Sequence, residues 1–133
     1  MAQPTPGPDG IEFLDYTPPR RFAAGARVGN MVYLAGETPR DPETGENVVG
    51  DIHQQTELVF QNIERSLRAF GTDLAHVIKI TVYLTDMANL PAVSAIRQRV
   101  FPRTIPSTTI QISRLTVPEF LVEIEAIALV PER

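Results

Sequence analysis

Three segments of the chain have the hydrophobic pattern of β-strands, one of them nearly continuously apolar and two of them alternating. The most apolar is Val77–Leu84, where β-branched residues predominate, and this composition predicts a central strand that is covered on more than one side. Residues Thr108–Ile112 and Val122–Leu129 alternate as strands with one buried face do. These segments supply three strands of the expected sheet.

The first part of the chain contains a hairpin signal. Residues Val28–Gly36 run from a Gly29-Asn30 pair into an apolar segment. Because such a pair supplies the positive φ of a tight turn, the residues up to Arg27 are expected to pair with the strand that follows. The polar segment Asp41–Glu46 contains a proline and a glycine and predicts a further turn.

Two segments show the period of amphipathic helices. In the first, Asp51 and Gln54 have the spacing of a capping box, and Gly71 is expected to end the helix. The apolar residues between them lie on one face: Leu58, Val59, Ile63, Leu67 and Phe70. In the second, Asn89 is expected to cap a helix that ends by Pro102.

The order of these elements predicts the fold class. Along the chain they give β-β-β-α-β-α-β-β, an α+β protein whose helices cover one face of the sheet. The proline-rich residues 1–19 are expected to form a flexible N-terminal arm with a short strand near Ile11–Leu14. Residues 20–133 are expected to form a single domain.

Composition excludes several classes of chemistry. The 133 residues include no cysteine and two histidines, so no thiolate nucleophile exists and no metal site is expected. Lysine and arginine number 12 against 16 acidic residues, a net charge of −4, which argues against nucleic acid as a partner. No apolar run could span a membrane, and no secretory signal opens the chain. We therefore expect a cytoplasmic protein with neither a membrane nor a nucleic-acid partner.

One pair of glutamates is the strongest candidate for catalysis. Glu123 and Glu125 are two positions apart on an alternating strand, so their side chains share one face, where the flanking residues are apolar. A carboxylate in such surroundings needs a partner or acquires a raised pKa, and it can then act as a general acid or base. The alternative is that both are solvated or paired with Arg114 and Lys79.

Two further segments have the composition of anion-binding sites. Residues Thr104–Thr109 are rich in hydroxyl groups and open a strand, where backbone amides and hydroxyls can hold a carboxylate. The alternative is an ordinary strand start with β-branched residues. The Arg20-Arg21 pair could attract an anion or could be an exposed charge pair.

Five stretches of the chain carry a pattern beyond secondary structure. They are Val28–Gly36, Asp41–Gly45, Thr81–Met87, Arg114-Leu115 and Val122–Ala128. In this order and spacing, over about residues 20–130, they resemble the RidA/YjgF family of reactive-intermediate deaminases. The resemblance covers most of the chain.

The resemblance implies a fold, an assembly and an activity. The fold is chorismate-mutase-like and α+β, with a mixed sheet, two helices packed on one face, and a homotrimer that binds small molecules at its subunit interfaces. Members of the best-known branch hydrolyse imines and enamines, such as 2-aminoacrylate and 2-iminobutanoate, to 2-keto acids and ammonia. They use no metal and no organic cofactor, so none is expected here.

The site residues of the family carry over one by one. The catalytic glutamate, which positions or activates water, corresponds to Glu123. The backbone group at the turn after the first hairpin corresponds to Gly36, preceded by Ala35. The aromatic residue of the cleft, usually tyrosine, corresponds to Phe22, and the polar helix residue, usually asparagine, corresponds to Ser94.

The carboxylate-binding arginine of the family corresponds to Ser107 in this sequence. A bidentate guanidinium–carboxylate contact is worth on the order of a few kcal/mol, whereas a serine hydrogen bond contributes about 1 kcal/mol net. Affinity for a small 2-imino acid is therefore expected to fall unless another cation takes over. Arg103, four residues earlier, is the candidate cation, and Thr108 and nearby backbone amides are expected to help hold the ligand.

Two functions remain open. In the first, the protein hydrolyses an imine, an enamine or a related carbonyl metabolite, and Glu123 orients the attacking water. In the second, it is a trimeric small-molecule-binding module that has lost turnover because Ser107 replaces the arginine. For 2-aminoacrylate itself, the missing arginine favours the second function, whereas the presence of Glu123 favours the first.

Overall fold

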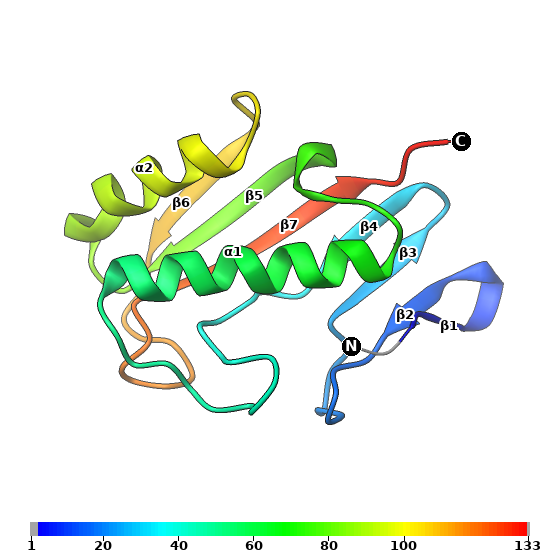
Figure 1. Cartoon of the computed structure of the whole chain (residues 1–133), viewed down its shortest axis with the longest axis horizontal. Helices are drawn as coiled ribbons and strands as arrows, with labels where there is room; N and C mark the ends of the chain where they lie inside the picture. Colours follow the sequence, from blue (N-terminus) through cyan, green and yellow to red (C-terminus); the bar gives the residue numbers. More distant parts are fainter. Residues whose placement is uncertain (1–2, 133) are drawn as a thin grey trace.

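A computed structural model describes residues 3–132 of the chain, and Figure 1 shows its arrangement. The strands are β1 (Thr5–Pro6), β2 (Glu12–Leu14), β3 (Gly25–Val28), β4 (Met31–Leu34), β5 (Val77–Leu84), β6 (Ser107–Gln111) and β7 (Val122–Leu129). The helices are α1 (Ile52–Ala69) and α2 (Leu90–Val100). Short 3-10 turns lie at Pro8–Gly10, Leu74–His76 and Met87–Asn89.

All the strands belong to one sheet. Their order is β1-β2-β3-β4-β7-β5-β6, and each neighbouring pair is antiparallel except β5 and β6, which are parallel. Both helices lie on the same face of this sheet (Figure 1), and α1 runs across β7 and beside α2. The α+β class with a mixed sheet and two helices on one face is therefore confirmed.

Local sequence signals placed several of these elements correctly. Gly29 has a φ of +58° in the turn between β3 and β4, as the hairpin signal predicted. Asp51 and Gln54 form the expected capping box, in which each side chain accepts a hydrogen bond from the backbone of the other. Gly71 follows the end of α1 with a φ of +84°, the conformation that favours glycine.

Two details of the sequence interpretation were wrong. Asn89 does not cap α2 with its side chain, because a 3-10 turn runs directly into the helix and the Asp86 carboxylate instead accepts from the backbone of Ala88. Strand β5 is not covered on both faces, because its exposure alternates along the strand. Its β-branched residues reflect its internal position, between β7 and β6, rather than burial on two sides.

The N-terminal segment packs against the edge of the sheet. Strand β2 pairs with β3, and β1 pairs with the outer side of β2. Leu14 is fully buried, and the ring of Tyr16 is 7% exposed, so this segment contributes side chains to the core. It also brings Tyr16 to the end of β4, beside the candidate site.

The sheet has one face packed against the helices and one face without a covering element. Alternate residues of β7, such as Val122 and Ile124, are fully buried on the helix side. Their neighbours Glu123 and Glu125 are only half-buried on the other side, which we call the open face. Neither helix in residues 3–132 has the length and apolar character needed to cross a membrane.

Candidate functional site

The segment that follows β4 lies directly beside Glu123 of β7. After β4, Glu37 forms a β-bridge with Ile124, and its N–H donates to the Ile124 carbonyl at 2.8 Å. This bridge brings Gly36 against the side chain of Glu123. A Cβ atom at residue 36 would lie 2.6 Å from Oε2 of Glu123. The absence of a side chain at residue 36 is therefore what allows the carboxylate to occupy this place.

Glu123 has the electrostatic character expected of an acid–base group. Burial raises the pKa of its carboxyl group, and the neighbouring charge of Glu125 raises the pKa further. Glu125 itself accepts a hydrogen bond from the Tyr83 hydroxyl at 2.8 Å. Among the described residues, no ion pair joins either glutamate to Lys79 or Arg114. The salt-bridged alternative for this pair is therefore wrong.

A second group of predicted residues meets around an arginine of α2. The Arg97 guanidinium donates from Nη1 to the Ser107 hydroxyl at 3.0 Å and from Nη2 to the Ser94 hydroxyl at 3.2 Å. Ser94 is one helical turn before Arg97, so the two side chains lie on the same side of α2. Ser107 opens β6. Two serine hydroxyls thus hold the Arg97 guanidinium beside Ser107, the residue that corresponds to the arginine of the family.

This guanidinium faces a cavity between α2 and the start of β6, which we call the α2–β6 cavity. Its volume is about 520 Å³. The lining residues are Leu90, Arg97, Gln98, Phe101, Pro102, Arg103, Thr104, Ile105, Ser107 and Thr109. None of them is acidic. Arg103 is exposed and donates from Nε to the Thr104 carbonyl, whereas Arg97 is half-buried.

The structure divides the sequence-predicted residues into two groups. Ala35 and Gly36 lie with Glu123, whereas Ser94, Ser107 and Arg103 lie at the α2–β6 cavity. Ser107 pairs with Ile80 and Glu123 pairs with Tyr83. Three residues along a strand correspond to roughly 10 Å. Because Ile80 is buried on the helix side and Glu123 points to the open face, one chain does not bring the two groups together.

Phe22 and Thr108 stand apart from both groups. Phe22 is 55% exposed and makes an edge-to-face contact with Tyr16 at a centroid distance of 5.7 Å. Thr108 pairs with Thr81, which pairs with Glu125, so Thr108 belongs to the open face rather than to the side of Ser107. The side chains of the adjacent residues 107 and 108 therefore lie on opposite faces of the sheet.

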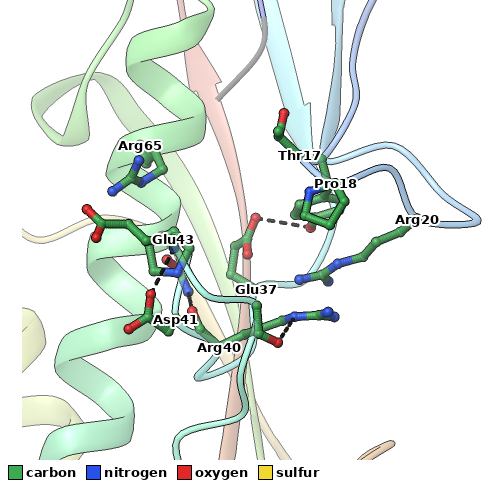
Figure 2. Close-up of a pocket in the computed structure, with 12 residues that line it drawn as sticks. Thr17, Pro18, Arg20, Glu37, Arg40, Asp41, Glu43 and Arg65 are labelled. Carbon is green, nitrogen blue, oxygen red and sulfur yellow. Dashed lines mark hydrogen bonds between the residues drawn. The ribbon is translucent and has the colours of Figure 1, made fainter.

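The sequence analysis missed a buried carboxylate, Glu37. Its side chain is 4% exposed and accepts from the Tyr16 hydroxyl at 3.1 Å and from the Ser66 hydroxyl at 3.4 Å. Burial is the main cause that raises its pKa from an ordinary 4.5 to about 7, and hydrogen bonds from Tyr16 and Ser66 and the charge of Arg20 oppose the rise. Figure 2 shows Glu37 at the centre of a cavity that has arginines on either side.

Weak signals for these missed residues were present. Arg97 interrupts the apolar face of the second helix and follows Ser94 by three positions. Glu37 directly follows the apolar strand that ends in Gly36. The partners of Glu37 are 21 and 29 residues away, so no local pattern could have found them.

Comparison with known proteins identifies the family. The family model described as Endoribonuclease L-PSP matches residues 15–130. A RutC family protein of Pyrococcus abyssi is 39% identical over 108 residues, which is 80% of this chain and 84% of that relative. Reactive Intermediate Deaminase A, chloroplastic, of Arabidopsis thaliana is 34% identical over 108 residues, which is 80% of this chain and 57% of that relative.

Solved structures agree with this assignment. The crystal structure of Escherichia coli TdcF with bound serine matches with a TM-score of 0.77 and 28% identity, and the match covers 83% of this chain and 88% of that one. The chain is therefore a member of the RidA/YjgF family.

Proposed function

We propose that this protein hydrolyses a small imine or enamine that carries a carboxylate, in a site shared between two copies of the chain. Glu123 of one copy would position the water. Arg97 of the neighbouring copy, held by Ser94 and Ser107, would bind the carboxylate. The observation that carries the proposal is the pair of hydrogen bonds from the Arg97 guanidinium to these two serines.

Glu123 is suited to both proton transfers of this reaction. Water adds to the imine carbon and forms a C–O bond, while Glu123 accepts one proton of the water and passes it to the imine nitrogen. In the resulting carbinolamine Glu123 takes the hydroxyl proton and returns it to the amine, the C–N bond breaks, ammonia leaves and a carbonyl group forms. The raised pKa of Glu123 suits a group that must both accept and return a proton. An enamine enters the same path after protonation at carbon, and neither route needs a metal or an organic cofactor.

Arg97 replaces the charge that the sequence lacks at residue 107. A guanidinium can bind a carboxylate through two parallel N–H groups. An arginine of α2 can therefore bind the same group as an arginine of β6 would, if its terminal nitrogens face the ligand. Ser94 and Ser107 accept hydrogen bonds from this group and add no competing negative charge. In this proposal Ser107 positions the cation, and Arg103 at the rim of the α2–β6 cavity does not bind the ligand.

A shared site requires an assembly, and we propose a homotrimer. Glu123 and the α2–β6 cavity belong to different sides of one chain, so the complete set of groups forms only where two copies meet. The open face also carries apolar side chains that gain from contact with a second copy: Tyr33 is 47% exposed and Leu129 is 39% exposed. Burial of such residues stabilises subunit interfaces.

The second candidate function is a binding module without turnover. The observation that favours it is Ser107 itself: a guanidinium supplied from α2 can hold an anion without placing its imine carbon beside Glu123. In that case the same ligands bind and no keto acid is released. A nucleic-acid partner is not favoured, because the net charge is −4.

The deciding experiment couples the protein to an enzyme that generates 2-aminoacrylate and measures the rate of 2-keto acid release above buffer. The deaminase proposal expects acceleration that is lost in Glu123→Gln and kept in Glu119→Gln, a matched exposed control. A series of imines made from larger amino acids extends the test to other substrates. No acceleration with any of them, together with saturable binding of the product keto acids, would establish the binding module instead.

A further inference from the structure

A second cavity lies on the helix side of the sheet, apart from the proposed deaminase site. Its volume is about 250 Å³. The lining residues are Tyr16, Thr17, Pro18, Arg20, Glu37, Arg40, Asp41, Pro42, Glu43, Gly45, Asn62 and Arg65. They come from the segment after β2, the loop after β4 and helix α1. We call this space the Glu37 cavity (Figure 2).

Two guanidinium groups occupy one side of the Glu37 cavity. Arg20 stacks on the Tyr16 ring, with its guanidinium carbon 3.9 Å from the ring centroid, and Arg40 donates from Nε to the Gly45 carbonyl at 2.7 Å. Figure 2 shows both groups below Glu37. Burial and the positive charge of Arg40 lower the pKa of Arg20. Within residues 3–132, no salt bridge reaches either arginine. Two like charges whose nearest anion is the partly protonated Glu37 favour a further anion between them.

The carboxylates of the cavity do not neutralise this pair. Asp41 and Glu43 lie with Arg65 on the opposite side of Glu37 (Figure 2), and Asp41 accepts from the backbone N–H groups of Glu43 and Thr44. Glu37 is engaged by Tyr16 and Ser66, and with a pKa of about 7 it carries only part of a negative charge near neutral pH.

A further polar group at the cavity lacks a partner. Asn62 is 6% exposed, and its Nδ2 donates to the carbonyls of Thr38 and Arg40 at 3.1 and 2.8 Å. These bonds fix the orientation of the amide. Its Oδ1 has no hydrogen-bond partner among the described residues. An unpaired buried acceptor is costly, so the wall of the cavity holds one polar group that the fold leaves unsatisfied.

We propose that the Glu37 cavity binds a small dianion, either a phosphate monoester or a dicarboxylate, between Arg20 and Arg40. Two guanidinium groups can each offer paired N–H donors, which matches two anionic groups or one phosphate. The volume is that of roughly eight water molecules, so the ligand is a small metabolite rather than a polymer. The site uses none of the residues assigned to the deaminase reaction.

The experiment is calorimetric titration of the full chain at low ionic strength with inorganic phosphate, with succinate and with acetate as the monoanion. Saturable binding of phosphate or succinate, with acetate weaker by about ten-fold or more, is the expected result. The preference between phosphate and succinate then identifies the source of the dianion. Failure of both dianions to bind would overturn the proposal.

Matched arginine variants locate the site. Arg20→Gln and Arg40→Gln are each expected to weaken binding by about ten-fold or more, whereas Arg21→Gln, which changes the exposed neighbour outside the cavity, is expected to leave it unchanged. Circular dichroism and thermal unfolding verify that each variant is folded, and Arg40→Gln leaves the Arg20–Tyr16 stack intact. The proposed site would be wrong if Arg21→Gln weakened dianion binding as much as the cavity variants do, or if neither Arg20→Gln nor Arg40→Gln weakened it.

Discussion

The guanidinium of Arg97 donates a hydrogen bond to the hydroxyl of Ser107 at 3.0 Å. This contact joins a helix residue to the first residue of β6. It places a cation beside the position at which the family resemblance implies an arginine. The neighbourhood of residue 107 is therefore cationic although residue 107 itself is a serine.

The first prediction concerns which arginine binds the substrate. Arg97→Gln should lower kcat/KM for a carboxylate-bearing imine by roughly 100-fold, because it removes a charge-assisted contact. Arg103→Gln should change it by less than about three-fold, since that side chain is exposed and engaged with its own backbone neighbour. Keto acid release under subsaturating conditions measures both. A larger loss in Arg103→Gln than in Arg97→Gln would show that Arg103 binds the substrate carboxylate. The double variant Arg97→Gln/Ser107→Arg should recover activity.

The second prediction tests the assembly of the site. Glu123→Gln and Arg97→Gln should each be inactive alone, yet co-refolded mixtures should recover about a quarter of the wild-type rate, because some interfaces then combine intact Arg97 with intact Glu123. Sedimentation equilibrium should give three times the mass of one 14.7 kDa chain. A monomer mass, or no recovery in mixed trimers, would contradict the shared site.

The third prediction concerns the close approach at Gly36. Gly36→Ala should displace the Glu123 carboxylate, because the new Cβ would lie 2.6 Å from its Oε2. Activity should fall by about ten-fold or more, and the pH–rate profile should shift as the burial of Glu123 changes. Thermal unfolding should report only a small loss of stability, since Glu123 can move toward the open face. Unchanged kinetics would show that the position of Glu123 is not critical.

The fourth prediction concerns pH and Glu37. Its pKa is raised from 4.5 to about 7 in the folded chain, so the folded state holds a proton that the unfolded state has lost. Stability from this group is complete below about pH 4.5 and is lost as pH rises through about 7, by roughly 3 kcal/mol at most. The charged and polar groups that face it are Tyr16, Arg20, Ser66 and Glu123.

Urea unfolding between pH 5 and pH 8.5 measures this effect. Glu37→Gln should be more stable than wild type at high pH and should lose most of the difference at pH 5, because the amide stays neutral. Glu119→Gln, an exposed control, should follow the wild-type curve. Parallel curves for wild type and Glu37→Gln would mean that Glu37 does not titrate differently in the folded state.

Sequence reasoning succeeded where a structure depends on near neighbours. The Gly29 turn, the Asp51–Gln54 capping box and the Gly71 helix end each involve a few consecutive residues with strong conformational preferences. The two-residue period of β7 also placed Glu123 and Glu125 on one face. The parallel pairing of β6 with β5 could not be predicted, because it depends on contacts far apart in the chain.

The candidate site followed the same rule. Glu123 and Gly36 came from the family resemblance, and their contact became visible only through the bridge between Glu37 and Ile124. Arg97 was placed in the second helix, but its link to Ser107 depends on how α2 packs beside the sheet. Whether residue 107 faced the helix or the open face was set by pairing with Ile80 and not by its own sequence context.

The bridge between Glu37 and Ile124 also couples the two proposed sites electrostatically. The Glu37 side chain points from this bridge into the Glu37 cavity. The side chain of Glu123, the residue before Ile124 in β7, points to the open face. The negative charge of Glu123 raises the pKa of Glu37, and a repulsion between charges acts equally in both directions. A proton gained by Glu37 therefore makes Glu123 easier to ionise, so the protonation states on the two sides of the sheet depend on each other.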